Sequence, residues 1–151
     1  MDDLRELYQQ IILDHNKDPK NYGKIVNCSH ASEGHNPLCG DHIKIYAQVE
    51  DGIIKDIKFE GEGCAIAKAS GSIMTALMKG KTIEEAEKLF KTFQDLITSE
   101  VDSEVDLENL GKLAVFAGVR EFPTRVKCAG LAWHTVKAAI DEEDKIVSTE
   151  E

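Results

Sequence analysis

Apolar residues at the start of the chain recur at helical spacing. The positions are Leu4, Leu7, Tyr8, Ile11 and Ile12. Because residues three and four apart share one face of a helix, this pattern predicts an amphipathic helix over about residues 3–15. Pro19 and Gly23 follow the pattern and are expected to end the helix.

The next pattern alternates with the period of a strand. Ile43, Ile45, Ala47 and Val49 are separated by His42, Lys44, Tyr46 and Gln48. This alternation predicts a strand with one buried face. Asp51-Gly52 is a hairpin turn signal, so residues 53–59 are expected to return as a second strand. A third strand is expected between residues 24 and 36.

The second half of the chain is predicted to be helical. Helices are expected over about residues 64–79, after the capping box Thr82–Glu85, over about 107–117, and over about 128–140. This order predicts an α+β fold, a small antiparallel β-sheet with helices packed on one face. We expect one domain over residues 1–151, with a frayed acidic tail from about 141.

Charge and hydropathy narrow the classes of partner. The 18 Lys and Arg residues against 28 Asp and Glu give a formal net charge of −10. This argues against nucleic acid, because phosphate binding requires clustered basic side chains. We find no run of about 18 apolar residues, so no membrane partner is expected. The N-terminus does not resemble a secretory signal, and we expect a cytoplasmic protein.

The four cysteines are Cys28, Cys39, Cys64 and Cys128. Disulfides are uncommon in the cytosol, so metal binding or a reactive thiol is the favoured use. The absence of a Cys-x-x-Cys pair excludes a zinc ribbon and a thioredoxin-type motif. Cys28 lacks neighbouring glycines and charges and is expected to pack in the core. The histidines, His134 among them, are expected to be surface or packing residues.

The other three cysteines share surroundings that favour a thiolate. Cys39 lies in a turn-rich loop, Cys64 follows a glycine-rich turn, and Cys128 follows the basic residues Arg125 and Lys127. We expect both Cys64 and Cys128 at helix starts, where the helix dipole stabilises a thiolate. These residues alone do not decide whether the three cysteines pack in the core or act as metal ligands or reactive thiols.

Asp41 could complete a set of metal ligands with these three cysteines. It lies two residues after Cys39, so one loop offers a sulfur and an oxygen. Three sulfurs and one oxygen fit tetrahedral zinc. A carboxylate is displaced from a soft metal more easily than a thiolate, which suits chemistry better than a purely structural site.

Several sequence segments of this chain resemble the SufU branch of the IscU/NifU N-terminal scaffold family. The resemblance covers nearly the whole chain, and its segments are residues 7–21 (LYQQIILDHNKDPKN), 36–41 (NPLCGD), 59–70 (FEGEGCAIAKAS), 74–80 (MTALMKG) and 122–133 (FPTRVKCAGLAW). IscU-type proteins have a His before the last cysteine, whereas this chain has Lys127. Residues 122–126 replace their chaperone-binding motif, and residues 93–113 resemble a SufU-type insertion.

The resemblance implies a site made of Cys39, Asp41, Cys64 and Cys128. SufU-like proteins bind zinc and accept persulfide sulfur from a SufS-type cysteine desulfurase, so the chain is expected to be a zinc-dependent sulfurtransferase. Cys39 would accept the sulfur, and Arg125 would stabilise the anionic site. Two alternatives remain. One is an IscU-like scaffold that assembles a [2Fe–2S] cluster on the same ligands for downstream cluster assembly proteins, and the other is a structural zinc module.

Overall fold

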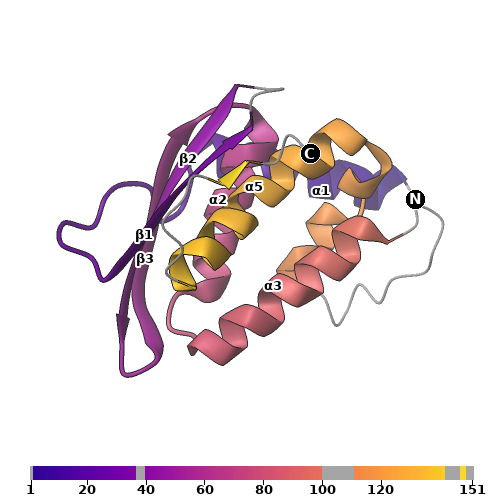
Figure 1. Cartoon of the computed structure of the whole chain (residues 1–151). Helices are drawn as coiled ribbons and strands as arrows, with labels where there is room; N and C mark the ends of the chain where they lie inside the picture. The colour runs from indigo at the N-terminus through magenta and orange to yellow at the C-terminus, as the bar shows by residue number, and fades with distance from the viewer. Residues whose placement is uncertain (1, 37–39, 100–110, 142–146, 149–151) are drawn as a thin grey trace.

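The computed structural model describes residues 2–36, 40–99, 111–141 and 147–148, and Figure 1 shows a sheet with helices beside it. The elements in chain order are α1 (Asp2–Lys17), β1 (His30–Asn36), β2 (Asp41–Glu50), β3 (Ile53–Glu62), α2 (Ala65–Met78), α3 (Ile83–Thr98), the 3₁₀ turns η1 (Gly111–Phe116) and η2 (Val119–Glu121), α5 (Pro123–Ile140) and β4 (Val147–Ser148). Within these ranges, no helix combines the length and the apolar character needed to cross a bilayer.

The sheet has the strand order β3-β2-β1-β4, and β1, β2 and β3 form an antiparallel meander. The predicted α+β fold is therefore confirmed, with helices on one face of the sheet (Figure 1). The third strand, which was expected between residues 24 and 36, is β1. In the tail that was expected to fray, Val147–Ser148 pair in parallel with Gly34 and His35 of β1.

The core lies between the sheet and the helices. The inward residues Ile43, Ile45 and Ala47 of β2 are buried, as the alternation predicted, and Val49 is half-buried. Strand β3 adds Ile54, Ile57 and Phe59 to the core. Helices α2 and α5 pack against these strands and against each other. Helix α3 joins this core through Phe93, whose ring stacks on that of Trp133 with centroids 4.4 Å apart.

Two of the predicted helices differ from the structure. Helix α5 begins at Pro123 instead of about residue 128, because Pro fits the first helical position and Phe122 before it is extended. Cys128 consequently lies in the second turn and does not start a helix. The helix predicted over 107–117 is a 3₁₀ turn from Gly111, and residues 107–110 lie outside the described ranges. The segment interpreted as an insertion, residues 93–113, begins inside α3.

Candidate metal centre

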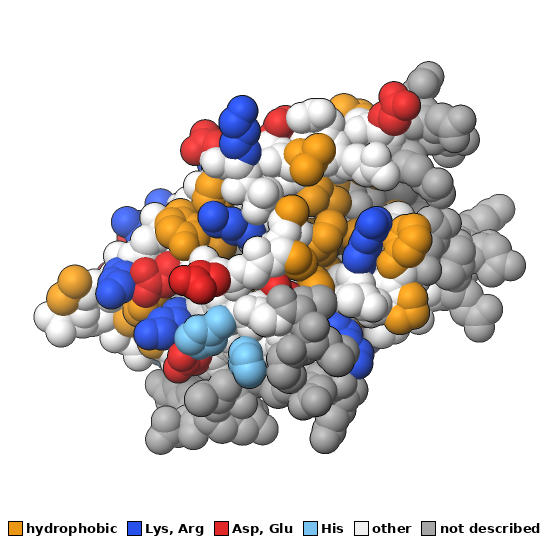
Figure 2. Space-filling view, turned by 90° about the horizontal axis from the view of Figure 1, so that it is seen from above, with side chains coloured by type: hydrophobic (Ala, Val, Ile, Leu, Met, Phe, Trp, Pro, Cys, Tyr) orange, Lys and Arg blue, Asp and Glu red, His pale blue; other side chains and the backbone are white. Residues whose placement is uncertain are grey.

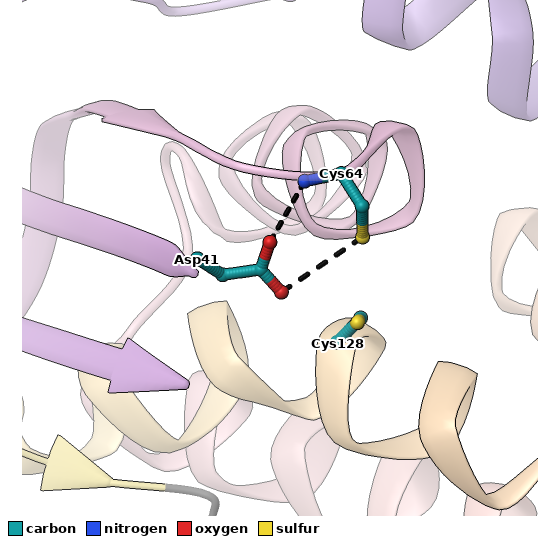
Figure 3. A group of neighbouring side chains, drawn as sticks. All are labelled: Asp41, Cys64 and Cys128. Carbon is teal, nitrogen blue, oxygen red and sulfur yellow. Dashed lines mark hydrogen bonds between the residues drawn. The ribbon is translucent and has the colours of Figure 1, made fainter. Parts of the chain in front are cut away.

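Three of the predicted ligands come together from three different elements. Asp41 is the first residue of β2, Cys64 directly precedes α2, and Cys128 lies in α5. One carboxylate oxygen and the two sulfurs all lie within 4.8 Å of one another. Figure 3 shows the three side chains directed toward the same space between the strand and the two helices.

Asp41 and Cys64 are joined by the start of helix α2. The backbone N–H of Cys64 donates to Asp41 Oδ1 at 2.7 Å, and the Cys64 thiol lies 3.8 Å from Asp41 Oδ2. Cys64 is the N-cap of α2, and its sulfur accepts the N–H of Ala67 at 3.4 Å. The predicted helix start at Cys64 is confirmed, and the same bonds orient two candidate ligands.

Gly63 makes this contact sterically feasible. Its φ of +149° lies in a region that side chains other than glycine rarely adopt. A Cβ built on Gly63 would meet Asp41 Oδ1 at 2.2 Å, so any larger residue would displace the carboxylate. The glycine in the GEGC segment is thus required by the approach of Asp41 to the backbone of Cys64.

Helix packing brings Cys128 under the other two ligands. Ser70 of α2 donates to the carbonyl of Ala129 at 2.6 Å and accepts the indole N–H of Trp133 at 3.0 Å. These buried bonds fix α2 against α5 next to Cys128, whose exposed fraction is 2%. On the other side, a Cβ at Gly34 would meet Thr135 Oγ1 at 2.0 Å, so α5 lies very close to β1.

The thiol of Cys64 is poised to ionise near neutral pH. Its hydrogen bond with Cys128 lowers the pKa of Cys64 to about 7, and the Ala67 N–H acts in the same direction. Burial and the Asp41 carboxylate oppose this shift. A thiolate at Cys64 is therefore accessible at neutral pH, and thiolates are the form that binds metals and attacks electrophiles.

The donor set fits a soft or borderline metal ion. Zn–S and Zn–O bonds of about 2.3 Å and 2.0–2.2 Å require ligand atoms to lie close together, and these three atoms lie within 4.8 Å of one another. A tetrahedral site needs a fourth ligand. Cys39, which the sequence predicts for that place, lies outside the described residues.

The remaining predicted residues lie in different surroundings. Arg125 is exposed on the first turn of α5, with its guanidinium 4.3 Å from the centre of the Phe122 ring. Cys28 is half-buried, and its thiol donates to the carbonyl of His30 at 3.2 Å. His134 is half-buried against the Phe90 ring, and burial lowers its pKa.

The sequence interpretation missed Asn36 as a residue of this centre. Its side-chain amide donates to Asp41 Oδ2 at 3.4 Å and to Cys128 Sγ at 3.7 Å. Asn36 pairs directly with Asp41 across the hairpin and shares its inward face, and this pairing depends on a strand register that the neighbouring residues in the sequence do not define.

Comparisons with known proteins identify the family of this chain. The family of the NifU-like N terminal domain matches residues 7–129. The zinc-dependent sulfurtransferase SufU of Bacillus subtilis (strain 168) is 42% identical over 142 residues, which are 93% of this chain and 94% of the relative. The iron-sulfur cluster assembly scaffold protein IscU of Thermotoga maritima is 38% identical over 137 residues, 91% of this chain and 94% of the relative.

A solved structure extends the similarity to three dimensions. The crystal structure of FiSufU from the thermophile Fervidobacterium islandicum AW-1 is 37% identical, with a TM-score of 0.79. The alignment covers 87% of this chain and 94% of that one. Because the family match and the identities both extend over most of the sequence, the chain belongs to the NifU-like N-terminal domain family, together with the SufU and IscU proteins it resembles.

Proposed function

We propose that this protein serves iron–sulfur cluster assembly as a zinc-dependent sulfurtransferase that accepts persulfide sulfur from a SufS-type cysteine desulfurase. The observation that carries the proposal is the convergence of Asp41, Cys64 and Cys128 within 4.8 Å, in a chain 42% identical to a zinc-dependent SufU. Cys39 is the proposed fourth ligand. Lys127, in the place where IscU-type proteins have a His, supports the SufU assignment over the scaffold.

Each residue has a proposed part in holding the metal. Cys64 and Cys128 are the anchoring ligands, because both are fixed by α2 and α5 and their packing through Ser70. Asp41 is the ligand that exchanges, since a carboxylate binds zinc less tightly than a thiolate. When bound, zinc would supply a positive charge that keeps its cysteine ligands ionised at neutral pH.

The proposed sulfur transfer is a thiolate exchange without net oxidation. The Cys39 thiolate attacks the outer sulfur of the desulfurase persulfide, and a new S–S bond forms on Cys39. The S–S bond of the desulfurase breaks, and its cysteine leaves as a thiolate. Arg125, exposed at the start of α5, is proposed to stabilise the negative charge gathered at this site.

The surface is compatible with docking to a protein partner. Figure 2 shows apolar side chains interspersed with acidic, basic and histidine side chains on the face that it presents. Protein–protein interfaces of transient complexes have this mixed character. The proposed partner is a SufS-type desulfurase carrying a cysteine persulfide.

The deciding experiment follows one sulfur atom. The zinc-loaded protein is incubated with a cysteine desulfurase and cysteine, and the intact mass is measured with and without a reductant. We expect the mass of one added sulfur in the wild type and in Cys28→Ala, and none in Cys39→Ala. Because three ligands and a water still form a site, Cys39→Ala should retain part of its zinc. Sulfur acceptance and full desulfurase turnover with Cys39→Ala would contradict the assignment.

The second candidate function is a scaffold for a [2Fe–2S] cluster. It is supported by the 38% identity to an IscU scaffold protein over 91% of the chain, because the same ligands would serve. Metal analysis of the purified protein separates the two functions. Zinc and a colourless protein support sulfur transfer, whereas iron, inorganic sulfide and a brown colour after incubation with desulfurase support the scaffold. Zinc without any sulfur acceptance would leave a structural zinc module.

A further inference from the structure

Asn36 is a fully buried polar residue at the end of β1, with an exposed fraction of 0%. It is the direct cross-strand partner of Asp41, and the two form the last pair of the β1–β2 ladder. Side chains of such a pair stand on the same face of the sheet. Both therefore point inward, toward the space where Cys64 and Cys128 lie.

The contacts of the Asn36 amide are divided unequally between its two ends. The Nδ2 group donates to Asp41 Oδ2 at 3.4 Å and to Cys128 Sγ at 3.7 Å. The Oδ1 atom is buried and has no hydrogen-bond partner among the described residues. The amide is thus oriented by two candidate metal ligands, because the opposite orientation would direct its carbonyl oxygen at a carboxylate and a sulfur.

Such an arrangement is unfavourable for the fold alone. Burying a carbonyl oxygen without a donor destabilises a protein, and an apolar residue of the same size would avoid that loss. An asparagine at this place is explained by its N–H groups, which hold one oxygen of Asp41 while the backbone of Cys64 holds the other. The carboxylate is then fixed by a donor at each oxygen.

We propose that Asn36 is a positioning residue of the metal centre, which orients Asp41 and Cys128 for a metal ion through the two N–H groups of its amide. The inference rests on the proposed function, because it presumes that these residues bind a metal. Groups that hydrogen-bond to metal ligands fix their orientation, and their loss typically reduces metal affinity by about 10–100-fold.

Asn36→Leu removes both N–H donors and keeps the number of side-chain atoms. Zinc affinity is measured by competition with a coloured chelator, and cobalt is loaded as a second probe, because its absorption reports the geometry of the ligands. We expect a loss of zinc affinity of about 10–100-fold and an altered cobalt spectrum. The melting temperature of the metal-free variant is recorded as well, because the substitution relieves the unpaired carbonyl oxygen but also removes a donor from the buried Asp41 carboxylate.

Ser32→Ala is the matched control. Ser32 lies on β1 four residues before Asn36 on the same side of the strand, and its Oγ is also buried without a partner among the described residues. It does not contact the three ligands in any hydrogen bond that the structure gives. Ser32→Ala should retain the zinc affinity and cobalt spectrum of the wild type.

Each outcome separates the positioning role from a structural one. Wild-type affinity and an unchanged cobalt spectrum in Asn36→Leu overturn the inference. So does a lower melting temperature of the metal-free protein with an unchanged spectrum in the loaded fraction, because Asn36 would then support only the fold. Asn36→Ala is measured in parallel. If Asn36→Leu does not fold, the zinc affinity and cobalt spectrum of Asn36→Ala decide between the two roles. A wild type that binds neither zinc nor cobalt refutes the proposed function instead.

Discussion

The starts of helices α2 and α3 use the same hydrogen-bond scheme with different parts. In α3, the Thr82 hydroxyl accepts the N–H of Glu85 at 3.1 Å, and the Glu85 carboxylate accepts the N–H of Thr82 at 3.0 Å. In α2, the Cys64 sulfur accepts the N–H of Ala67, and the carboxylate of Asp41 accepts the N–H of Cys64. Both caps therefore satisfy the same two backbone donors.

The difference lies in where the carboxylate comes from and what else it can do. Glu85 belongs to the first turn of α3 and is exposed, so its cap stabilises that helix locally. Asp41 comes from β2, 23 residues before Cys64, and is fully buried. Sulfur is a weak hydrogen-bond acceptor, so the α2 cap stabilises its helix less than the α3 cap does. The α2 cap instead holds two candidate ligand atoms close together.

Substituting Cys64 should give the largest effect and separate its two roles. Serine is a preferred N-cap residue but a poor zinc ligand, whereas alanine is neither. We expect both Cys64→Ser and Cys64→Ala to lose zinc, with the metal-free serine variant more stable by about 1 kcal/mol. Zinc content by elemental analysis and chemical denaturation of the metal-free proteins measure the two effects.

Metal removal completes this test. Binding energy at a metal site is also folding energy, so a chelator should lower the melting temperature of the wild type clearly. The same chelator should leave Cys64→Ser unchanged. An equal response of the two proteins would show that Cys64 does not contribute to the site.

Gly63→Ala should disturb the α2 cap by displacing Asp41. The new Cβ would lie 2.2 Å from Asp41 Oδ1 and would occupy a strained φ of +149°, at a cost of about 1–3 kcal/mol for the backbone alone. We expect lower stability together with weaker zinc binding. Gly52→Ala is the control, because Gly52 has a φ of +74° and no atom within 4 Å of the added Cβ. It should lose stability without losing zinc affinity.

The contrast between the caps also explains what the sequence could predict. The α3 cap is contained in one turn, so Thr82 and Glu85 identify it from four consecutive residues. The alternation after Asp41 likewise defines β2 and its buried face. These features depend on neighbours along the chain, and local spacing is sufficient to find them.

The metal centre depends on contacts that no local pattern contains. Cys128 was placed at a helix start, whereas α5 begins five residues earlier at Pro123. The approach of Cys128 to Cys64 depends on Ser70, which joins α2 to α5. The residues alone therefore offered the ligand set without deciding between metal binding and core filling, and the resemblance favoured metal binding. Asn36 was missed because its role depends on the strand register.

Thr82→Ala should have a smaller effect, limited to stability. Loss of an N-cap hydroxyl costs about 1 kcal/mol, because the N–H of Glu85 is left without its acceptor. Zinc affinity should remain that of the wild type, since α3 supplies none of the three ligands that converge in the described structure. Denaturation and chelator competition on the same samples measure both quantities. Weaker zinc binding in Thr82→Ala would remove the distinction between the two caps.

Glu85→Gln should give the smallest effect, and one that depends on pH. The hydrogen bond from the backbone N–H of Thr82 lowers the pKa of Glu85, so folding favours its charged form. That contribution is present above the ordinary pKa of a glutamate and disappears as the pH falls through the lowered value in the folded protein. Glutamine keeps the hydrogen bond without the charge. In a Cys64→Ser background, where acid release of zinc plays no part, Glu85→Gln should melt slightly below its parent at pH 7, by less than Thr82→Ala does. The difference should vanish well below about pH 4. A difference that stays constant across this range would mean that the charge of Glu85 does not contribute to the cap.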